Sequence, residues 1–433
     1  MDILFGIFNS IASVINHTWW IILPIFLFPL FWNLRLIYLR TRFVKEIEWT
    51  MLEVKVPKEI FKTPKAMEQI FAGAYASYSY GMNYISKYLE GKVEPWFSFE
   101  LVGSNGGVYF YIRTPSKYRN LIESAIYAQY PETEIHQVED YLDLLPSILP
   151  NKIYDVFGAD LILVKENYYP IKTYTYFEEP VEERRLDSIA AITEVMSNLK
   201  TDEWLLLHIL ISPTGALTGN DWQKEGQEKI NELSGKKTEK GKKGWGGAIY
   251  DWLRNLSFAA VKYPDWPDPK EKEAAMMKFL NPYEQDVVKA LGSKISKLGF
   301  EIILRLVYLD RQDSFTPANF SAAMGALHQL NTANLNAFKP HPFLKSWTID
   351  DWFTKIFPRY KSLKEIYRKR RIFKYCRQRR FGQYNKTRPE KFSILSTEEL
   401  ATIYHFPAIP VKAPRLRTVE AKKGGPPAGL PVE

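Results

Sequence analysis

An apolar run near the N-terminus constrains this chain more than any other feature of its sequence. Residues 19–38 (WWIILPIFLFPLFWNLRLIY) contain one charged side chain, Arg35, close to the end of the run. Twenty helical residues extend about 30 Å, the thickness of a bilayer hydrocarbon core. We therefore predict a transmembrane helix over residues 17–40. Residues 1–16 either form a short amphipathic helix on the outer membrane surface or continue the same helix.

The basic residues around this run predict its orientation. Arg35, Arg40, Arg42 and Lys45 lie at or after its end, and no Lys or Arg precedes it. The positive-inside rule then places the N-terminus outside and the bulk of the chain in the cytoplasm. We expect a single-pass protein of the cell inner (cytoplasmic) membrane. A cleaved signal peptide is the alternative, but the basic n-region and the A-x-A cleavage site are missing.

The residues that follow the anchor predict an α+β fold. Residues 45–145 show alternating apolar stretches, a glycine-rich hairpin turn and two helical stretches, in the order β-α-β-β-α-β. This order is that of a ferredoxin-like unit. The expected strands are 46–56, 96–102, 108–113 and 134–138. The expected helices are 115–129 and 66–88, the latter either continuous or broken near Ser79.

A second unit of the same kind is predicted over residues 153–345, with a helical insertion at about 214–298. A true duplication and two unrelated α+β modules both fit this pattern. The insertion contains predicted helices at 221–233 and 270–291 and a basic, glycine-rich stretch at 236–243. The expected strands are 172–177, 204–212, 300–309 and 333–338, and the expected helices are 186–199 and 316–330.

The sequence carries no catalytic or metal-binding signature. It lacks the Walker A, H-E-x-x-H, G-x-S-x-G and EF-hand patterns. Its six histidines are scattered, and Cys376 is its single cysteine. His208 lies in an apolar strand, where a satisfied core histidine is the ordinary case. We expect no enzyme, no cofactor and no metal. A membrane-bound enzyme stays a third functional class, which would require a pocket of convergent polar groups.

A strongly basic helical segment is predicted over residues 347–392. Residues 359–388 carry a net charge of +12, whereas the whole chain carries +9, so the remainder is slightly acidic. Such a segment could be a solvated face, lie on anionic lipid or contact nucleic-acid phosphate. A protein partner also stays open. The candidate residues for nucleic-acid or lipid binding are Arg368, Lys369, Arg370, Arg371, Lys374, Arg377, Arg379 and Arg380.

Residues 395–407, LSTEELATIYHFP, raise the question of an active site because they combine hydroxyls, carboxylates and a histidine. Ser396 and Glu399 fit a capping box at the start of a short helix, and Pro407 fits its end. These polar groups therefore have a structural explanation. The proline-rich residues 408–433 predict a disordered tail.

The stretch 395–431 resembles the segment that precedes the motor domain in membrane-anchored ATPases of the HerA/FtsK class, which serve conjugation and type IV secretion. In these proteins an E-L-A-T-x-x-H-x-P stretch leads through a proline-rich linker into the motor. The resemblance implies that residues 395–407 form a joint between a platform and the motor. The residues that match this joint are Glu399, Leu400, Ala401, Thr402, His405 and Pro407.

The chain has no Walker A or Walker B motif, so the resemblance carries no ATPase residue over to it. We expect a membrane-anchored, non-enzymatic scaffold that recruits or positions a HerA/FtsK-class ATPase supplied by a separate chain. Expected contacts are anionic lipid and DNA, and homo-oligomerisation stays open. The alternative function is a stand-alone membrane-tethered nucleic-acid-binding protein.

Overall fold

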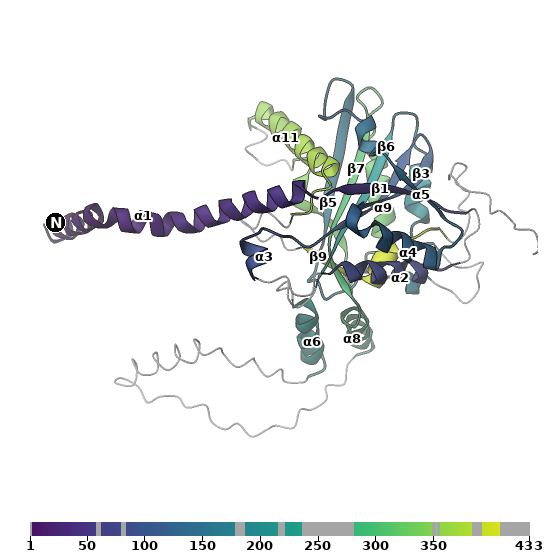
Figure 1. Cartoon of the computed structure of the whole chain (residues 1–433), viewed down its shortest axis with the longest axis horizontal. Helices are drawn as coiled ribbons and strands as arrows, with labels where there is room; N and C mark the ends of the chain where they lie inside the picture. The colour runs from purple at the N-terminus through teal and green to yellow at the C-terminus, as the bar shows by residue number, and fades with distance from the viewer. Residues whose placement is uncertain are drawn as a thin grey trace, which may run out of the picture.

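The computed structural model describes residues 2–57, 62–78, 84–177, 187–214, 221–235, 281–348, 352, 356–382 and 392–407. It combines helices with one nine-stranded antiparallel sheet, and a long N-terminal helix projects from this body (Figure 1). The prediction of an α+β fold with an apolar N-terminal helix is confirmed.

The N-terminal helix α1 (Asp2–Lys45) is continuous and contains Pro24 and Pro29. Its part from Thr18 to Lys45 is long and apolar enough to cross a bilayer, and little of it is covered by the body. A signal sequence at an N-terminus passes the same test of length and composition. Because α1 has no break near residue 16, the first residues continue the helix, which was one of the two alternatives.

The first half of the sheet follows the predicted β-α-β-β-α-β order. Its β2–β3 hairpin turns at Asn105 and Gly106, which both have positive φ. Short 3-10 turns, η1 (Tyr75–Ser77) and η2 (Ser116–Tyr118), follow α2 and precede α4. The elements are β1 (Trp49–Lys55), α2 (Lys65–Ala74), α3 (Tyr84–Tyr88), β2 (Phe97–Ser104), β3 (Gly107–Pro115), α4 (Arg119–Gln129) and β4 (Glu134–Val138).

The second half repeats this order, with two helices of the predicted insertion between its second and third strands. A 3-10 turn, η3 (Tyr141–Leu144), connects the halves, and another, η4 (Tyr174–Tyr176), follows β5. The elements are β5 (Tyr154–Leu163), α5 (Ala190–Ser197), β6 (Trp204–Pro213), α6 (Trp222–Leu233), α8 (Pro282–Ile295), β7 (Gly299–Arg311), α9 (Ala318–His328) and β8 (Phe338–Lys345).

The two halves form one continuous sheet. The strand order is β4-β1-β3-β2-β6-β7-β5-β8, and the halves meet where β2 pairs antiparallel with β6 from Phe97↔Ile211 to Ser104↔Trp204. The last strand, β9 (Ser393–Ser396), pairs with the first residues of β7, beside the stretch of β7 that β5 covers.

The main core lies between one face of the sheet and helices α2, α4, α5, α9 and α12 (Thr397–Ile403). A second, smaller core lies on the opposite face. There the residues that follow β4 and the helix α11 (Pro358–Arg377) pack on strands from both halves. The basic helix therefore covers the face of the sheet that the other helices leave open.

The helix predicted over 66–88 is interrupted: α2 ends at Ala74, η1 ends at Ser77, Tyr78 is not helical, and α3 begins at Tyr84. Three further sequence predictions of structure need correction. The first strand of the second half is β5, whereas residues 172–177 contain only the turn η4. The last strand, β8, begins at Phe338, where the predicted strand ended. Helix α8 begins at Pro282, later than predicted, with a capping box between Asn281 and Glu284. The predicted basic stretch 236–243, residues 270–280 and the tail 408–433 lie outside the described residues.

Candidate functional site

The basic helix α11 is held to the sheet by its C-terminal half. Ile372, Phe373 and Cys376 are buried against strands of both halves of the sheet. The N-terminal half of α11, by contrast, extends beyond the sheet (Figure 1). The helix therefore presents two different environments to the residues that the sequence grouped into one binding surface.

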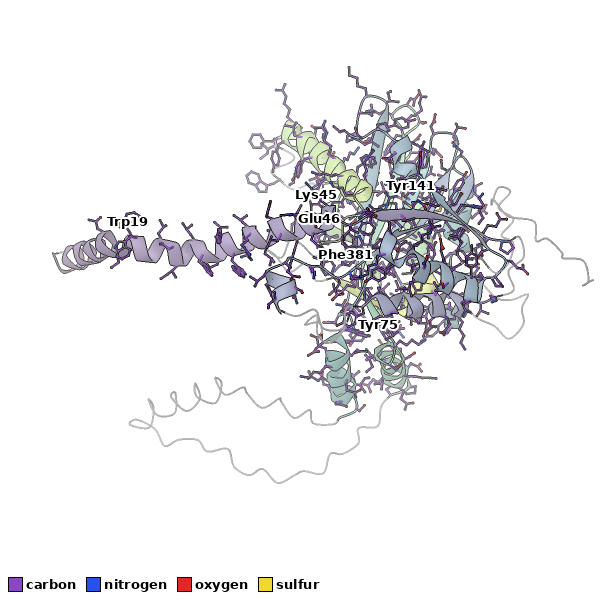
Figure 2. The ribbon with its side chains drawn as sticks, viewed as in Figure 1. Trp19, Lys45, Glu46, Tyr75, Tyr141 and Phe381 are labelled. Carbon is purple, nitrogen blue, oxygen red and sulfur yellow. The ribbon has the colours of Figure 1, made fainter. Side chains whose placement is uncertain are left out.

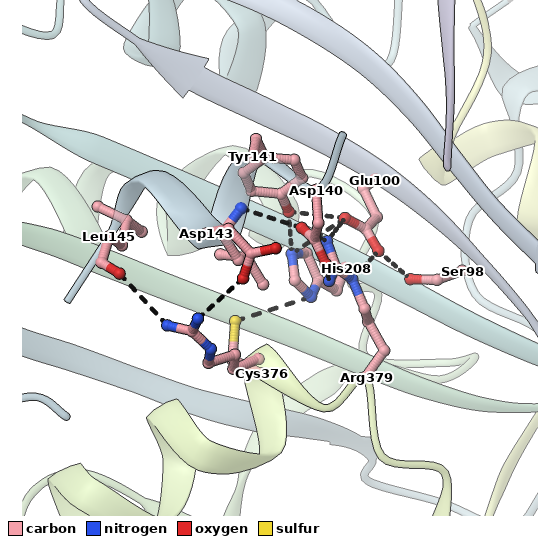
Figure 3. Close-up of polar contacts among 11 residues, drawn as sticks. Ser98, Glu100, Asp140, Tyr141, Asp143, Leu145, His208, Cys376 and Arg379 are labelled. Atoms are coloured by element: carbon pink, nitrogen blue, oxygen red, sulfur yellow. Dashed lines mark hydrogen bonds and ion pairs between the residues drawn. The ribbon is translucent and has the colours of Figure 1, made fainter. Parts of the chain in front are cut away.

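Arg379, one of the predicted binding residues, is fully buried beneath the C-terminal end of this helix. Its Nε donates to Glu100 Oε1 at 2.8 Å, its Nη2 donates to Glu100 Oε2 at 3.1 Å, and it also pairs with Asp140 (Figure 3). Glu100 and Asp140 together accept from four of the five N–H donors of this guanidinium, and its burial keeps the fifth away from phosphate outside the protein. Arg379 therefore has a structural role in this conformation.

Glu100 and Arg379 belong to a buried polar cluster that also contains Tyr141, His208 and Cys376 (Figure 3). The Tyr141 hydroxyl donates to Glu100 Oε2 at 2.6 Å and lies 2.6 Å from His208 Nε2. Cys376 Sγ lies 3.7 Å from His208 Nδ1. A neutral imidazole protonated at Nε2 satisfies both contacts, because it donates to Tyr141 and accepts from the thiol.

The charge state of the cluster follows from its burial. Burial lowers the pKa of His208 to about 4, against the opposing effect of Glu100. Burial alone would raise the pKa of Glu100, but Arg379 and His208, with hydrogen bonds from Arg379 and Ser98, hold that pKa well below its usual range. The cluster thus holds a carboxylate, a guanidinium and a neutral histidine at neutral pH.

This cluster resembles a Cys–His–Glu catalytic set in its composition only. Cys376 is fully buried, and burial raises the pKa of its thiol to about 12, so a thiolate nucleophile is not available. Among the described residues no group of His, Cys, Asp and Glu could hold a metal ion. The cluster can fix α11 to the sheet, and its geometry indicates no chemistry.

Four basic residues of α11 are partly engaged with the body. Lys369 donates to Asp155 at 2.6 and 2.8 Å, and Arg368 donates to the backbone carbonyl of Trp347 at 2.6 Å. Arg377 donates to Asp143 at 2.8 Å, and Arg371 donates to the carbonyl of Phe343. These contacts orient the side chains and leave part of each exposed.

Arg370 and Lys374 lie on the exposed face of α11. Arg380 follows the helix, and its guanidinium lies over the ring of Tyr375 at 4.8 Å. Of the eight predicted binding residues, the structure thus places one in the interior, two fully on the surface and the others between these extremes. The binding role of the exposed residues stays a prediction.

The predicted joint, residues 395–407, is built into the main core. The capping box is present: Ser396 Oγ accepts from the Glu399 backbone N–H at 3.4 Å, and Glu399 Oε2 accepts from the Ser396 N–H at 2.8 Å. Glu399 also pairs with the buried Lys294 at 3.0 Å and accepts from the Ile171 N–H at 2.9 Å. Burial lowers the pKa of Lys294, although Glu399 opposes this effect.

The remaining joint residues are also buried. Thr402 Oγ1 accepts from the Tyr174 N–H at 2.9 Å, and His405 Nε2 lies 3.0 Å from Asp187 Oδ1. Leu400, Ala401 and the ring of His405 are almost without solvent contact. In this conformation these side chains reach no surface, so they fix the position of Pro407 and of the chain that follows it.

Sequence reasoning missed the buried partners of Arg379. Glu100 is the one acidic residue in the apolar strand sequence FSFELVG, and Asp140 precedes the first residue of η3. A carboxylate in a buried strand requires a cationic partner, and this signal was available. Its partner, 279 positions later, was not identifiable without the fold.

Neither a protein-family model nor a curated protein matches this chain.

Proposed function

We propose that this chain is a membrane-anchored, non-enzymatic platform of a DNA-translocation system like those of conjugation and type IV secretion. It would recruit or position an ATPase of the HerA/FtsK class. The proposal combines the apolar helix α1, the basic helix α11 and the resemblance of residues 395–431 to the segment that precedes the motor in that class.

One structural observation supports the platform proposal in addition to the sequence. The stretch LSTEELATIYHFP is a strand and a helix within the main core, joined to both halves of the protein. Strand β9 pairs with β7, whereas α12 packs on α2 of the first half. A segment held in this way gives the chain after Pro407 a fixed starting point. A platform needs such a point to position a motor.

We also propose that each half of the body is a ferredoxin-like unit. The support is the strand order, which is β4-β1-β3-β2 in the first half and β8-β5-β7-β6 in the second, with antiparallel pairing throughout. Both correspond to fourth, first, third, second in chain order. Helices of both halves cover the same face of the sheet, as this type of unit requires.

The proposed location is the cell inner membrane, with the N-terminus outside and the body in the cytoplasm. The support is the distribution of basic residues around the apolar run, which all lie on the body side. In this arrangement the exposed Arg370 and Lys374 would face cytoplasmic DNA or the anionic inner leaflet.

Purification of the tagged full-length chain from its native membranes in mild detergent tests the platform proposal. Mass spectrometry should identify a HerA/FtsK-class ATPase in near-stoichiometric amount. Deletion of residues 408–433 should remove it. This deletion is preferable to one that starts at Leu395, because β9 and α12 are part of the core and their loss would unfold the protein.

A variant in which residues 408–433 keep their composition in scrambled order is the matched control for chain length. If no ATPase accompanies the intact chain in detergent that preserves membrane complexes, the platform proposal fails. Salt-dependent binding of duplex DNA to the purified chain would then support the alternative, a membrane-tethered nucleic-acid-binding protein.

A further inference from the structure

Large apolar side chains are exposed at the outer end of α11, which we define as residues 356–367. Leu363 is 67% exposed and Tyr367 is 62% exposed. Ile356, Phe357, Tyr360 and Ile366 are exposed as well, and Trp352, just before them, is 73% exposed. An exposed apolar cluster of this size on a globular body marks a contact surface.

Apolar and basic residues share one face of this helix. Tyr360, Leu363, Tyr367, Arg370 and Lys374 follow one another at spacings of three and four residues, and all five are exposed. This spacing places them along one side of an α-helix, with the apolar residues toward the outer end and the basic residues toward the body. The opposite side carries the buried Ile372 and Cys376. The exposed face is therefore apolar at its outer end and basic at the end nearer the body.

The outer end of α11 lies on the side of the body from which α1 projects (Figure 1). The short helix α3 lies on this side too, and Ile85 and Leu89 are exposed there. The chain after α3 packs directly on α1: a Cβ at Gly91 would lie 2.7 Å from the Cβ of Leu39. Leu39 follows the apolar run by one residue, so α3 sits where α1 would leave the bilayer.

We infer that the outer end of α11 is a second membrane contact, which docks on an anionic leaflet beside α1. This inference rests on the proposed anchoring of the chain through α1. Trp, Tyr and Leu side chains would enter the interfacial region, where amphipathic rings are favoured, and Arg370 and Lys374 would meet lipid phosphate. Together with α1 and α3, this contact would hold the sheet in one orientation relative to the membrane plane.

Nucleic acid is the competing occupant, and the apolar residues argue against it. Binding to duplex backbone depends on cationic and hydrogen-bonding groups that face phosphate. On the exposed face of α11, the three residues nearest the outer end are Tyr360, Leu363 and Tyr367, and the buried Arg379 does not contribute. A lipid surface would contact both the apolar and the basic residues of this face, whereas duplex DNA would contact the basic residues only.

Site-specific fluorescence on the full-length chain in lipid nanodiscs tests this inference. A Leu363→Cys variant would carry an environment-sensitive NBD label, in nanodiscs of phosphatidylcholine with or without about one-third phosphatidylglycerol. Cys376, the other cysteine, is buried and should stay unlabelled, which the parent chain verifies. Tyr127→Cys on α4, on the far side of the body from α1, is the matched control.

We expect the label at position 363 to shift to the blue and to be quenched by nitroxide lipids in anionic nanodiscs. The label at position 127 should report water in both lipids. Combined Arg370→Gln and Lys374→Gln substitutions should lower the ratio of docked to undocked chain about 30-fold, since each basic residue near an anionic surface contributes a factor of about five. High salt should act in the same direction.

The possible failures are distinguishable. If the chain does not enter nanodiscs, both the anchoring and the docking are wrong. If it enters and the label at position 363 reports water in anionic lipid, the docking is wrong and the anchoring stands. If the label responds to added duplex DNA and not to lipid, the outer end of α11 is a nucleic-acid surface and this inference is overturned.

Discussion

The outer end of α11 and its inner end, residues 372–382, both carry basic side chains, but these side chains lie in different environments. At the inner end Arg379 is buried between two carboxylates, whereas at the outer end Arg359, Leu363 and Tyr367 are exposed. The carboxylates that engage Arg379 come from β2 and from the residue before η3, far away in the chain. The density of basic residues in a sequence therefore does not distinguish exposed residues, which are available for binding, from buried residues that stabilise the fold.

Replacement of the buried arginine should have the largest effect on stability. Arg379→Met leaves Glu100 buried without its cationic partner, which typically costs about 3–5 kcal/mol. Urea unfolding of the detergent-solubilised chain, followed by near-UV circular dichroism, measures this loss. Arg370→Met is the matched control on the exposed face and should change stability by less than about 0.5 kcal/mol. Equal losses in the two variants would contradict the division of the helix into two environments.

Acid should destabilise the inner end in a defined pH window. The pKa of His208 is about 4 in the folded chain and its ordinary value is 6.5, so unfolding takes up a proton between these values. The free energy of unfolding should therefore fall as the pH drops from 6.5 to 4, by roughly 3 kcal/mol. The lowered pKa of Glu100 acts in the same direction below about pH 4.5.

Unfolding free energies measured from pH 7.5 to 4 test this window. The variant His208→Gln should be less stable at neutral pH and should show a shallower decline between pH 6.5 and 4. An unchanged slope in the variant would show that other groups control the acid response.

The middle of the helix should give an intermediate effect. Lys369 and Asp155 form an ion pair whose two side chains are each about one-fifth exposed, with relative accessibilities of 20% and 21%. Loss of a pair at this depth in Lys369→Met should cost about 1 kcal/mol, because the remaining carboxylate can be rehydrated. Lys374→Met is the matched control, because Lys374 lies on the exposed face one to two turns further along the helix. If Lys369→Met lost as much free energy of unfolding as Arg379→Met, burial along the helix would not determine how much its basic residues stabilise the fold.

The sequence predicts most strands of the sheet because they are long, apolar and bounded by turns. Strands β2, β3, β4, β6 and β7 fall close to their predicted ranges. Strand β5 was missed because Asp155, Gly158 and Asp160 interrupt its apolar pattern. Asp160 is buried in an ion pair with Arg305 of β7, and Gly158 allows close contact with the Leu306 carbonyl. Both reasons depend on a strand that is distant in sequence.

The false strand at residues 172–177 and the late start of β8 also have local causes. KTYTYF alternates like a strand, but its backbone forms the turn η4. Tyr174 points into the core from this turn, and its hydroxyl donates to Glu68 at 2.9 Å. Strand β8 contains Pro340 and Pro342, a residue type that is unfavourable in the interior of a sheet. Prolines are tolerated there because β8 is an edge strand.

For the candidate site, the sequence identifies the segments but not their exposure. The capping box at Ser396 follows from short-range spacing and is confirmed. The burial of residues 395–407 depends on β7 and α2, which no local pattern reveals. The exposed position of Leu363 and Tyr367 depends in the same way on where the sheet ends beneath α11.

The pairing of β2 with β6 gives the body an internal symmetry. Each is the second strand of its half, and the two run antiparallel, so the strand order reads the same from both ends of the sheet. This is the arrangement that two identical subunits adopt across an isologous two-fold interface, here within one polypeptide. In the part of the chain that the structure describes, β4, β8 and the short strand β9 each pair with one strand only. A further copy that extended the sheet through described strands would join at one of these three.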